Sequence, residues 1–318
     1  MPTSRSEPYC PHPDTLFDAD WLSLRSAADS TARSTQLTAR LAAWLAQRAA
    51  DSAQPLRLCD LGCGSGANPR YLAPRLPGPQ HWRLLDHDAR LLEHARQHCL
   101  ALCDRDGQPI GAETERVDLR AVHAAPLADS DLITASALLD LVDANWLEDF
   151  ADCCLRLGCA VLITLSVDGH WHIDAAPGSP SNISPGISPG PDADDDFVRT
   201  AFNAHQRQDK GGAAALGPDA APRLAELLRA RGFEVELAPS PWRLSAAEPA
   251  QAALARALID GWRAAASEQR PEARARIAAW HQRRLAALEQ SHLHITLGHL
   301  DLLALPRRPV ATPMPSGQ

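Results

Sequence analysis

Residues 60–66 read Asp-Leu-Gly-Cys-Gly-Ser-Gly, and they have the residue types and the spacing best suited to bind a ligand. The alternate glycines Gly62, Gly64 and Gly66 let the backbone pass close to a ligand and present its N–H groups to it. Asp60 stands two residues before the first glycine, at the end of a mostly apolar run. The pattern predicts a ligand-binding turn between a strand and a helix, with a carboxylate beside it.

A second carboxylate, Asp86, closes a short apolar run about 20 residues beyond the glycines, where it can accept hydrogen bonds from both hydroxyls of a ribose. NAD-binding folds use the same device, so an NAD(P)-dependent oxidoreductase is an open alternative. The dinucleotide fingerprint, however, is G-x-G-x-x-G, whereas position 67 here is alanine. That fingerprint also does not require an acid two residues before its first glycine. The spacing therefore favours a different nucleotide-binding loop.

The acid, the apolar residue and the G-x-G-x-G of this turn resemble the nucleotide-binding loop of class I S-adenosylmethionine-dependent methyltransferases. The resemblance is specific over residues 56–141 and topological elsewhere. It implies that Asp60 orients the methionine part of S-adenosylmethionine and that Asp118 contacts the adenine amino group. In the fourth-strand motif of the small-molecule members, Ser136 matches the residue after the strand, whereas Asp140 departs from the usual His or Gln. The predicted cofactor-binding residues are Asp60, Gly62, Gly64, Gly66, Asp86, Asp118 and Ser136.

The resemblance predicts an enzyme that transfers a methyl group from S-adenosylmethionine to a small molecule. Displacement at a sulfonium methyl depends mainly on holding the acceptor in line, although oxygen and nitrogen acceptors can also need a general base. A cofactor-binding protein without catalysis is a further alternative, because a loop that binds need not lie beside an acceptor pocket.

Acceptor recognition is assigned to residues 202–212, which are dense in hydrogen-bonding groups. Lys210 is the only lysine of the chain, and with His205 it is a candidate for a catalytic group. Such a segment suits an acceptor that carries a carboxylate or a phosphate. A solvated helix face that ends at a glycine is the alternative interpretation. The predicted substrate-binding residues are Asn203, His205, Arg207 and Lys210.

Strands and helices alternate along the chain, which predicts an α/β fold with a doubly wound, mostly parallel sheet and helices on both faces. Apolar spacing predicts a helix over 37–45, and a nearly continuous apolar run predicts a buried strand over 159–167. The third and fourth strands are expected at 115–119 and 132–135. The resemblance implies seven strands, of which the last, 293–303, is antiparallel to the rest. Ligands of such sheets bind at the edge where the strands end.

Composition divides the chain into a polar N-terminal segment, 1–33, a single domain, 34–305, and a flexible tail, 306–318. Residues 175–196 are rich in Pro, Gly and Ser and end in an acidic run, so they are predicted to be a disordered insertion.

The net charge of −8 argues against a nucleic acid or an anionic membrane as the partner. The chain begins without the apolar core of a signal peptide, and its longest apolar run is too short to cross a bilayer, so a cytoplasmic location is expected. None of the eight cysteines forms a C-x-x-C pair, and His170 and His172 lack a third ligand nearby, so no metal is expected. Oligomeric state is not readable from the sequence.

Overall fold

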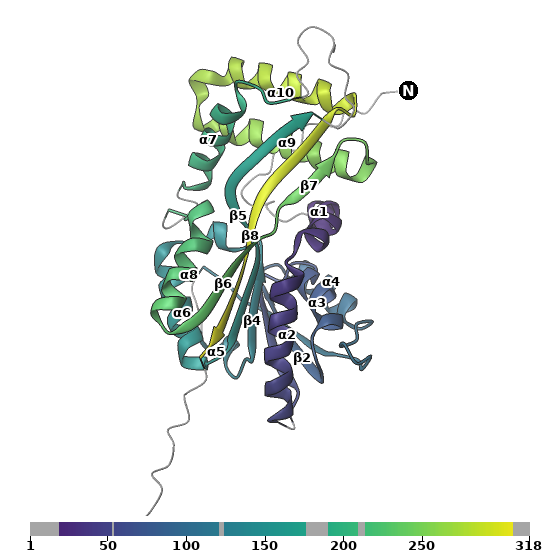
Figure 1. Ribbon diagram of the computed structural model, residues 1–318, viewed down its shortest axis with the longest axis vertical. Helices are drawn as coiled ribbons and strands as arrows, with labels where there is room; N and C mark the ends of the chain where they lie inside the picture. Colours follow the sequence, from purple (N-terminus) through teal and green to yellow (C-terminus); the bar gives the residue numbers. More distant parts are fainter. Residues whose placement is uncertain (1–18, 53, 121–123, 176–189, 209–213, 308–318) are drawn as a thin grey trace, which may run out of the picture.

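The computed structural model describes residues 19–52, 54–120, 124–175, 190–208 and 214–307 (Figure 1). One sheet runs through the molecule, with strand order β3-β2-β1-β4-β5-β8-β6, and β7 pairs with β8 off this path. The strands are β1 (Leu56–Leu61), β2 (Gln80–Asp86), β3 (Gly111–Arg116), β4 (Leu132–Ser136), β5 (Ala160–Ala175), β6 (Phe233–Pro239), β7 (Trp242–Ser245) and β8 (Leu293–Pro306).

Strands β1 to β5 are parallel to their neighbours among themselves, whereas β8 is antiparallel to β5, β6 and β7. The predicted α/β fold, with a mostly parallel seven-stranded path and an antiparallel last strand, is confirmed. Strand β7 is an eighth strand that the sequence pattern did not predict. The prediction of a third strand at 115–119 was displaced, since β3 ends at Arg116. None of the β3 residues is fully buried at this edge of the sheet, so no apolar run marks the strand.

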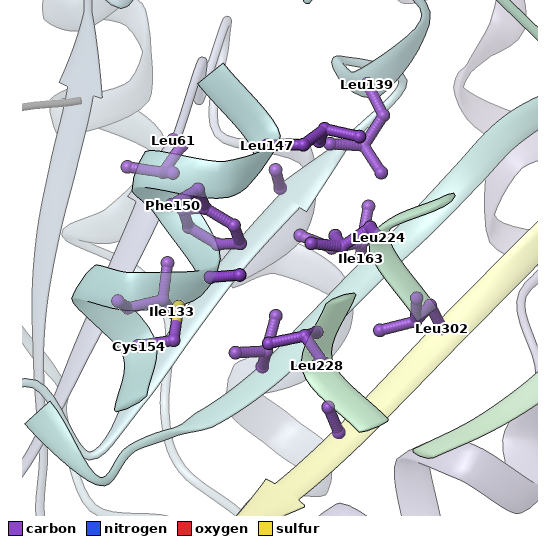
Figure 2. Packing of buried hydrophobic residues seen from close by; sticks show 14 of the residues in the cluster. Leu61, Ile133, Leu139, Leu147, Phe150, Cys154, Ile163, Leu224, Leu228 and Leu302 are labelled. Carbon is purple, nitrogen blue, oxygen red and sulfur yellow. The ribbon is translucent and has the colours of Figure 1, made fainter. Parts of the chain in front are cut away.

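Helices cover both faces of the sheet (Figure 1). On one face, Phe150 of α6 (Ala144–Leu157) and Leu224 of α8 (Ala220–Ala230) pack around Ile163 of β5 (Figure 2). On the other face, Leu41 and Leu45 of α2 belong to a second buried cluster. The helices of this part are α2 (Thr35–Ala50), α3 (Ala67–Leu72), α4 (Ala89–Cys99), α5 (Ala124–Leu127), α6 (Ala144–Leu157) and α8 (Ala220–Ala230), with short 3-10 turns η1 (Ala73–Arg75), η2 (Leu139–Leu141) and η3 (Gly217–Asp219).

A second lobe continues from two long strands, β5 and β8, which reach beyond the rest of the sheet (Figure 1). Their pairing shifts register between Ile163 and Ser166 and again between Val167 and Trp171, and such irregularities bend a strand pair. We use "second lobe" for the far halves of these strands, 168–175 and 293–298, with β7, α1 (Ala19–Ala32), α7 (Asp195–Gln206), α9 (Pro249–Gln269), η4 (Pro271–Ala273) and α10 (Arg274–Glu289). Its core contains Trp171, stacked on Trp262 with ring centroids 4.2 Å apart.

Two segments are more ordered than their composition indicated. Within the polar segment 1–33, the helix α1 packs Trp21 and Leu24 against the core of the second lobe. Of the insertion 175–196, residues 176–189 lie outside the described residues, but the acidic end is fixed. There, Asp195 is buried and accepts hydrogen bonds from Arg284 and from Trp280 Nε1. Arginines on α10 neutralise the acidic run, and the composition of the run alone does not indicate these partners.

Candidate functional site

The turn after β1 has the backbone that its glycines predicted. Gly62, Gly64 and Gly66 have φ angles of 61°, 52° and 83°, in the left-handed region that glycine adopts without strain. At Gly66 a side chain would also be crowded, since a Cβ there would lie 3.3 Å from the Ala95 Cα of α4, closer than an ordinary van der Waals contact. The close approach of α4 and the left-handed backbone together require glycine at position 66.

Asp60 lies at the end of β1 and is 1% exposed. Its Oδ1 accepts a hydrogen bond of 2.6 Å from Asn68 Nδ2, and its Oδ2 has no hydrogen-bond partner among the described residues. Burial raises the pKa of Asp60 to about 7, against the lowering effects of the Asn68 hydrogen bond and the Arg33 charge. A buried carboxylate with one oxygen that accepts no hydrogen bond raises the free energy of the folded protein, unless a donor, preferably a cation, approaches that oxygen.

The positive charge next to Asp60 comes from Arg33, which lies between α1 and α2 and is 4% exposed. Its Nη1 donates to Asn68 Oδ1 at 2.6 Å, and its Nη2 donates to Ser136 Oγ at 3.1 Å. The guanidinium carbon also lies 4.9 Å from the centre of the Tyr71 ring. Asn68 therefore joins the carboxylate of Asp60 to the guanidinium of Arg33, and Arg33 brings Ser136 into the same cluster.

Asp86 ends β2 and is buried beside the glycine turn. Its Oδ2 accepts from the backbone N–H of Gly64 at 2.9 Å, and its Oδ1 accepts from the N–H of Asp88 at 3.0 Å. Oδ1 also lies 3.2 Å from His87 Nδ1. The carboxylate therefore holds the turn in place, and its Oδ2 keeps capacity for a second hydrogen bond. Its charge also contributes to the raised pKa of Asp60, so the two acids lie near one another.

Asp118 stands apart from that buried cluster. Its side chain is 54% exposed and pairs with Arg120, whose hydrogen bonds lower the pKa of Asp118 to about 2. The neighbouring Leu119 does approach the turn, because a Cβ on Gly62 would lie 3.8 Å from its Cδ1 and 3.2 Å from Cδ1 of Leu138. The adenine contact assigned to Asp118 stays a prediction.

The predicted acceptor residues lie on or just after α7, in the second lobe. Asn203 Nδ2 donates to Gly169 O of β5 at 2.8 Å, while His205 Nε2 lies 2.9 Å from Glu268 of α9. Arg207 pairs with Asp219 at 2.9 Å. Among the described residues, none of these hydrogen bonds reaches the glycine turn. Lys210 lies outside the described residues. The assignment of these residues to an acceptor stays a prediction.

Three residues of the cluster around Asp60 were not predicted from the sequence. Asn68, in the first turn of α3, and Thr134, whose Oγ1 lies 3.4 Å from Asn68 Nδ2, are both buried polar residues. Their signal was a polar residue at a position that otherwise faces the core. Arg33 gave no local signal, because only the fold brings it to Asp60.

The described residues contain no group of three or more His, Cys, Asp or Glu side chains that could hold a metal ion. No helix in this part of the chain is long and apolar enough to cross a membrane.

No protein-family model and no curated protein matches the chain. Solved structures similar to it include a mycolic acid cyclopropane synthase bound to S-adenosylhomocysteine (14% identity, 82% of each chain covered, TM-score 0.40). Others are an O-methyltransferase family protein from Burkholderia thailandensis (15% identity, 73% of this chain and 60% of that one, TM-score 0.38) and human N-acetylserotonin methyltransferase with S-adenosylmethionine (15% identity, 71% and 50%, TM-score 0.36).

Because these likenesses are distant, the fold assignment rests on the chain's own strand order and glycine turn. In both respects the chain resembles the class I S-adenosylmethionine-dependent methyltransferases: a mostly parallel sheet, an antiparallel last strand, and a glycine turn after the first strand.

Proposed function

We propose that this protein is an S-adenosylmethionine-dependent methyltransferase that acts on a small-molecule acceptor. The observation that carries the proposal is the buried Oδ2 of Asp60, which accepts no hydrogen bond from the described residues and belongs to the strand that leads into a left-handed glycine turn. S-adenosylmethionine bears an ammonium and a sulfonium, so a buried carboxylate with a raised pKa suits it better than it suits an anionic dinucleotide. The residues present therefore fit this cofactor.

In this proposal each residue of the cluster has a defined task. Asp60 accepts from the ammonium group of the cofactor, the backbone at Gly62 and Gly64 passes close to it, and Asp86 fixes the turn and accepts from the ribose. When bound, the cofactor supplies an electrophilic methyl group. The protein's contribution is then placement of the acceptor against that methyl, which is worth roughly 7–11 kcal/mol at best.

The acceptor is proposed to enter between the glycine turn and the second lobe. Helix α1 brings the second lobe next to the glycine turn, since a Cβ on Gly64 would be 3.2 Å from Leu22 Cδ1. The same helix packs on the core of the second lobe. His205 and Lys210, with Asn203 and Arg207, are the residues proposed to recognise a small acceptor that carries a carboxylate or phosphate.

Calorimetry with S-adenosylhomocysteine and with NADH tests the cofactor. We expect binding of S-adenosylhomocysteine and none of NADH, and the reverse preference would refute the proposal. Release of S-adenosylhomocysteine from S-adenosylmethionine in the presence of pooled metabolites then tests catalysis, because a protein that only binds the cofactor releases none.

A further inference from the structure

The surroundings of Arg33 are unusual for a buried cation. Arginine is almost never fully buried unless its charge is paired. Here the side chain is 4% exposed, yet no carboxylate oxygen of the described residues lies within ion-pair distance of its guanidinium. Its two direct partners, Asn68 Oδ1 and Ser136 Oγ, are neutral acceptors. The charge of Arg33 is therefore held in place without being paired directly.

The guanidinium also has an unused donor. Arg33 Nε is buried and has no hydrogen-bond partner among the described residues. An unmet donor on a buried, charged group costs free energy that an anion at that place would recover. On the other side of the Asn68 amide lies an acceptor without a hydrogen-bond partner among the described residues, Oδ2 of Asp60. The site thus offers a cationic donor and an anionic acceptor, one amide apart.

This pairing matches the end of an α-amino acid, in which an ammonium and a carboxylate are attached to one carbon. Building on the proposed function, we propose that Arg33 binds the carboxylate of the amino-acid end of S-adenosylmethionine. Asp60 takes the ammonium on the other side of Asn68. Arg33 is therefore a cofactor-binding residue supplied from outside the glycine turn.

The fold fixes Arg33 from both neighbouring elements. Its backbone N–H donates to Asp29 O at the end of α1, and the next N–H, of Ser34, donates to Asp301 Oδ2 of β8 at 2.7 Å. The Asp29 carboxylate in turn accepts from Trp242 Nε1 of β7 at 3.1 Å. These contacts fix the main chain at Arg33, and the hydrogen bonds to Asn68 and Ser136 orient its guanidinium, as the recognition of a planar carboxylate requires.

The test compares S-adenosylmethionine with decarboxylated S-adenosylmethionine, two ligands that differ only in the carboxylate. By calorimetry, the wild-type protein is expected to prefer the former by about 10- to 100-fold, as a hydrogen-bonded charge pair warrants. In Arg33→Gln this preference should fall below about threefold, while affinity for the decarboxylated ligand stays within about threefold of wild type. Arg33→Lys keeps the charge but loses the fork of donors, so it should retain part of the preference.

Arg40→Gln is the matched control, since Arg40 lies on α2 with its partners Glu234 and Glu236 on β6 and should leave both affinities unchanged. Equal losses for both ligands in Arg33→Gln, or a retained preference, would overturn the assignment of the carboxylate. Should the variants fail to fold, the wild-type comparison decides, because equal affinity for the two ligands excludes a carboxylate site. Binding of neither ligand by the wild type would overturn the proposed function as well.

Discussion

Replacing Asp60 with asparagine is expected to stabilise the ligand-free protein and to weaken cofactor binding. The carboxylate is buried, and its pKa is raised from 3.8 to about 7 because burial outweighs the Asn68 hydrogen bond and the attraction of Arg33. An asparagine keeps an oxygen that can accept from Asn68 and removes the charge. Removing the buried charge should therefore raise the stability of the ligand-free protein and lower its affinity for the cofactor.

The stability effect depends on pH in a defined way. Well below pH 3.8, the carboxyl group is neutral in both the folded and the unfolded chain, and the two proteins should be similar. As pH rises towards 7, the unfolded chain releases its proton before the folded one, so the stability of the wild type falls relative to the variant. Above pH 7 the difference is constant, at up to about 4 kcal/mol for a shift of roughly three pKa units.

Cofactor binding should respond in the other direction. The ionised Asp60 attracts an ammonium group, and a hydrogen bond to a charged group contributes about 1.5–3 kcal/mol. At pH 8, Asp60→Asn should bind S-adenosylhomocysteine about 10- to 150-fold more weakly than the wild type. The affinity of the wild type should rise between pH 6 and pH 8 as Asp60 ionises. The affinity of the variant should lack this rise, because asparagine does not ionise.

Thermal unfolding at pH 4 and pH 8, together with calorimetry, measures both effects. The control is Asp129→Asn: the Asp129 side chain is 75% exposed and pairs with Arg57, and asparagine tolerates its φ of 61°. This variant should match the wild type in both assays. The reasoning fails if Asp60→Asn is less stable than the wild type at pH 8, or if its advantage is the same at both pH values.

Three further substitutions test the framework of the site. Gly66→Ala should destabilise the protein by about 1–3 kcal/mol, because its left-handed backbone strains alanine and Ala95 blocks the methyl group; urea unfolding would measure this, and a neutral effect would contradict it. Asp301→Asn should cost about 1–3 kcal/mol, since its two oxygens together accept from three donors and the NH2 of an asparagine leaves at least one of these donors without an acceptor; an unchanged urea midpoint would count against that role. Arg284→Met should cost about 3–5 kcal/mol by leaving the buried Asp195 charge without its main partner, and a melting temperature equal to that of the wild type would disprove it.

Much of the fold could be predicted because its signals are local. The turn at 60–66 needs left-handed backbone at three alternate positions, and only the glycines permit this cheaply. The apolar runs of β1, β2, β4 and β5 mark strands that are buried in the middle of the sheet. An edge strand such as β3 buries few side chains, so its boundaries were misplaced.

The parts that the sequence did not predict depend on contacts between distant residues. Arg33 and Ser136 are 103 positions apart and meet only because α2 and β4 contribute to one buried cluster, which contains Leu41 and Leu132. Likewise, β5 extends to Ala175 because its far half pairs with β8, a partner more than a hundred residues away. Periodicity reports which face of an element is buried, but it does not report which distant polar groups share that face.

The same contacts connect the two halves of the proposed reaction. The link between α1 and α2 carries Arg33 into the cofactor site, and it is held at one side by Asp29 and at the other by Asp301. Asp29 is bonded to Trp242 of β7, and Asp301 accepts from Ser240 just before that strand. Both anchors therefore lead to β7, the strand added to the seven-stranded path. These two acids therefore connect the second lobe, which is proposed to hold the acceptor, to Arg33, which is proposed to hold the methyl donor.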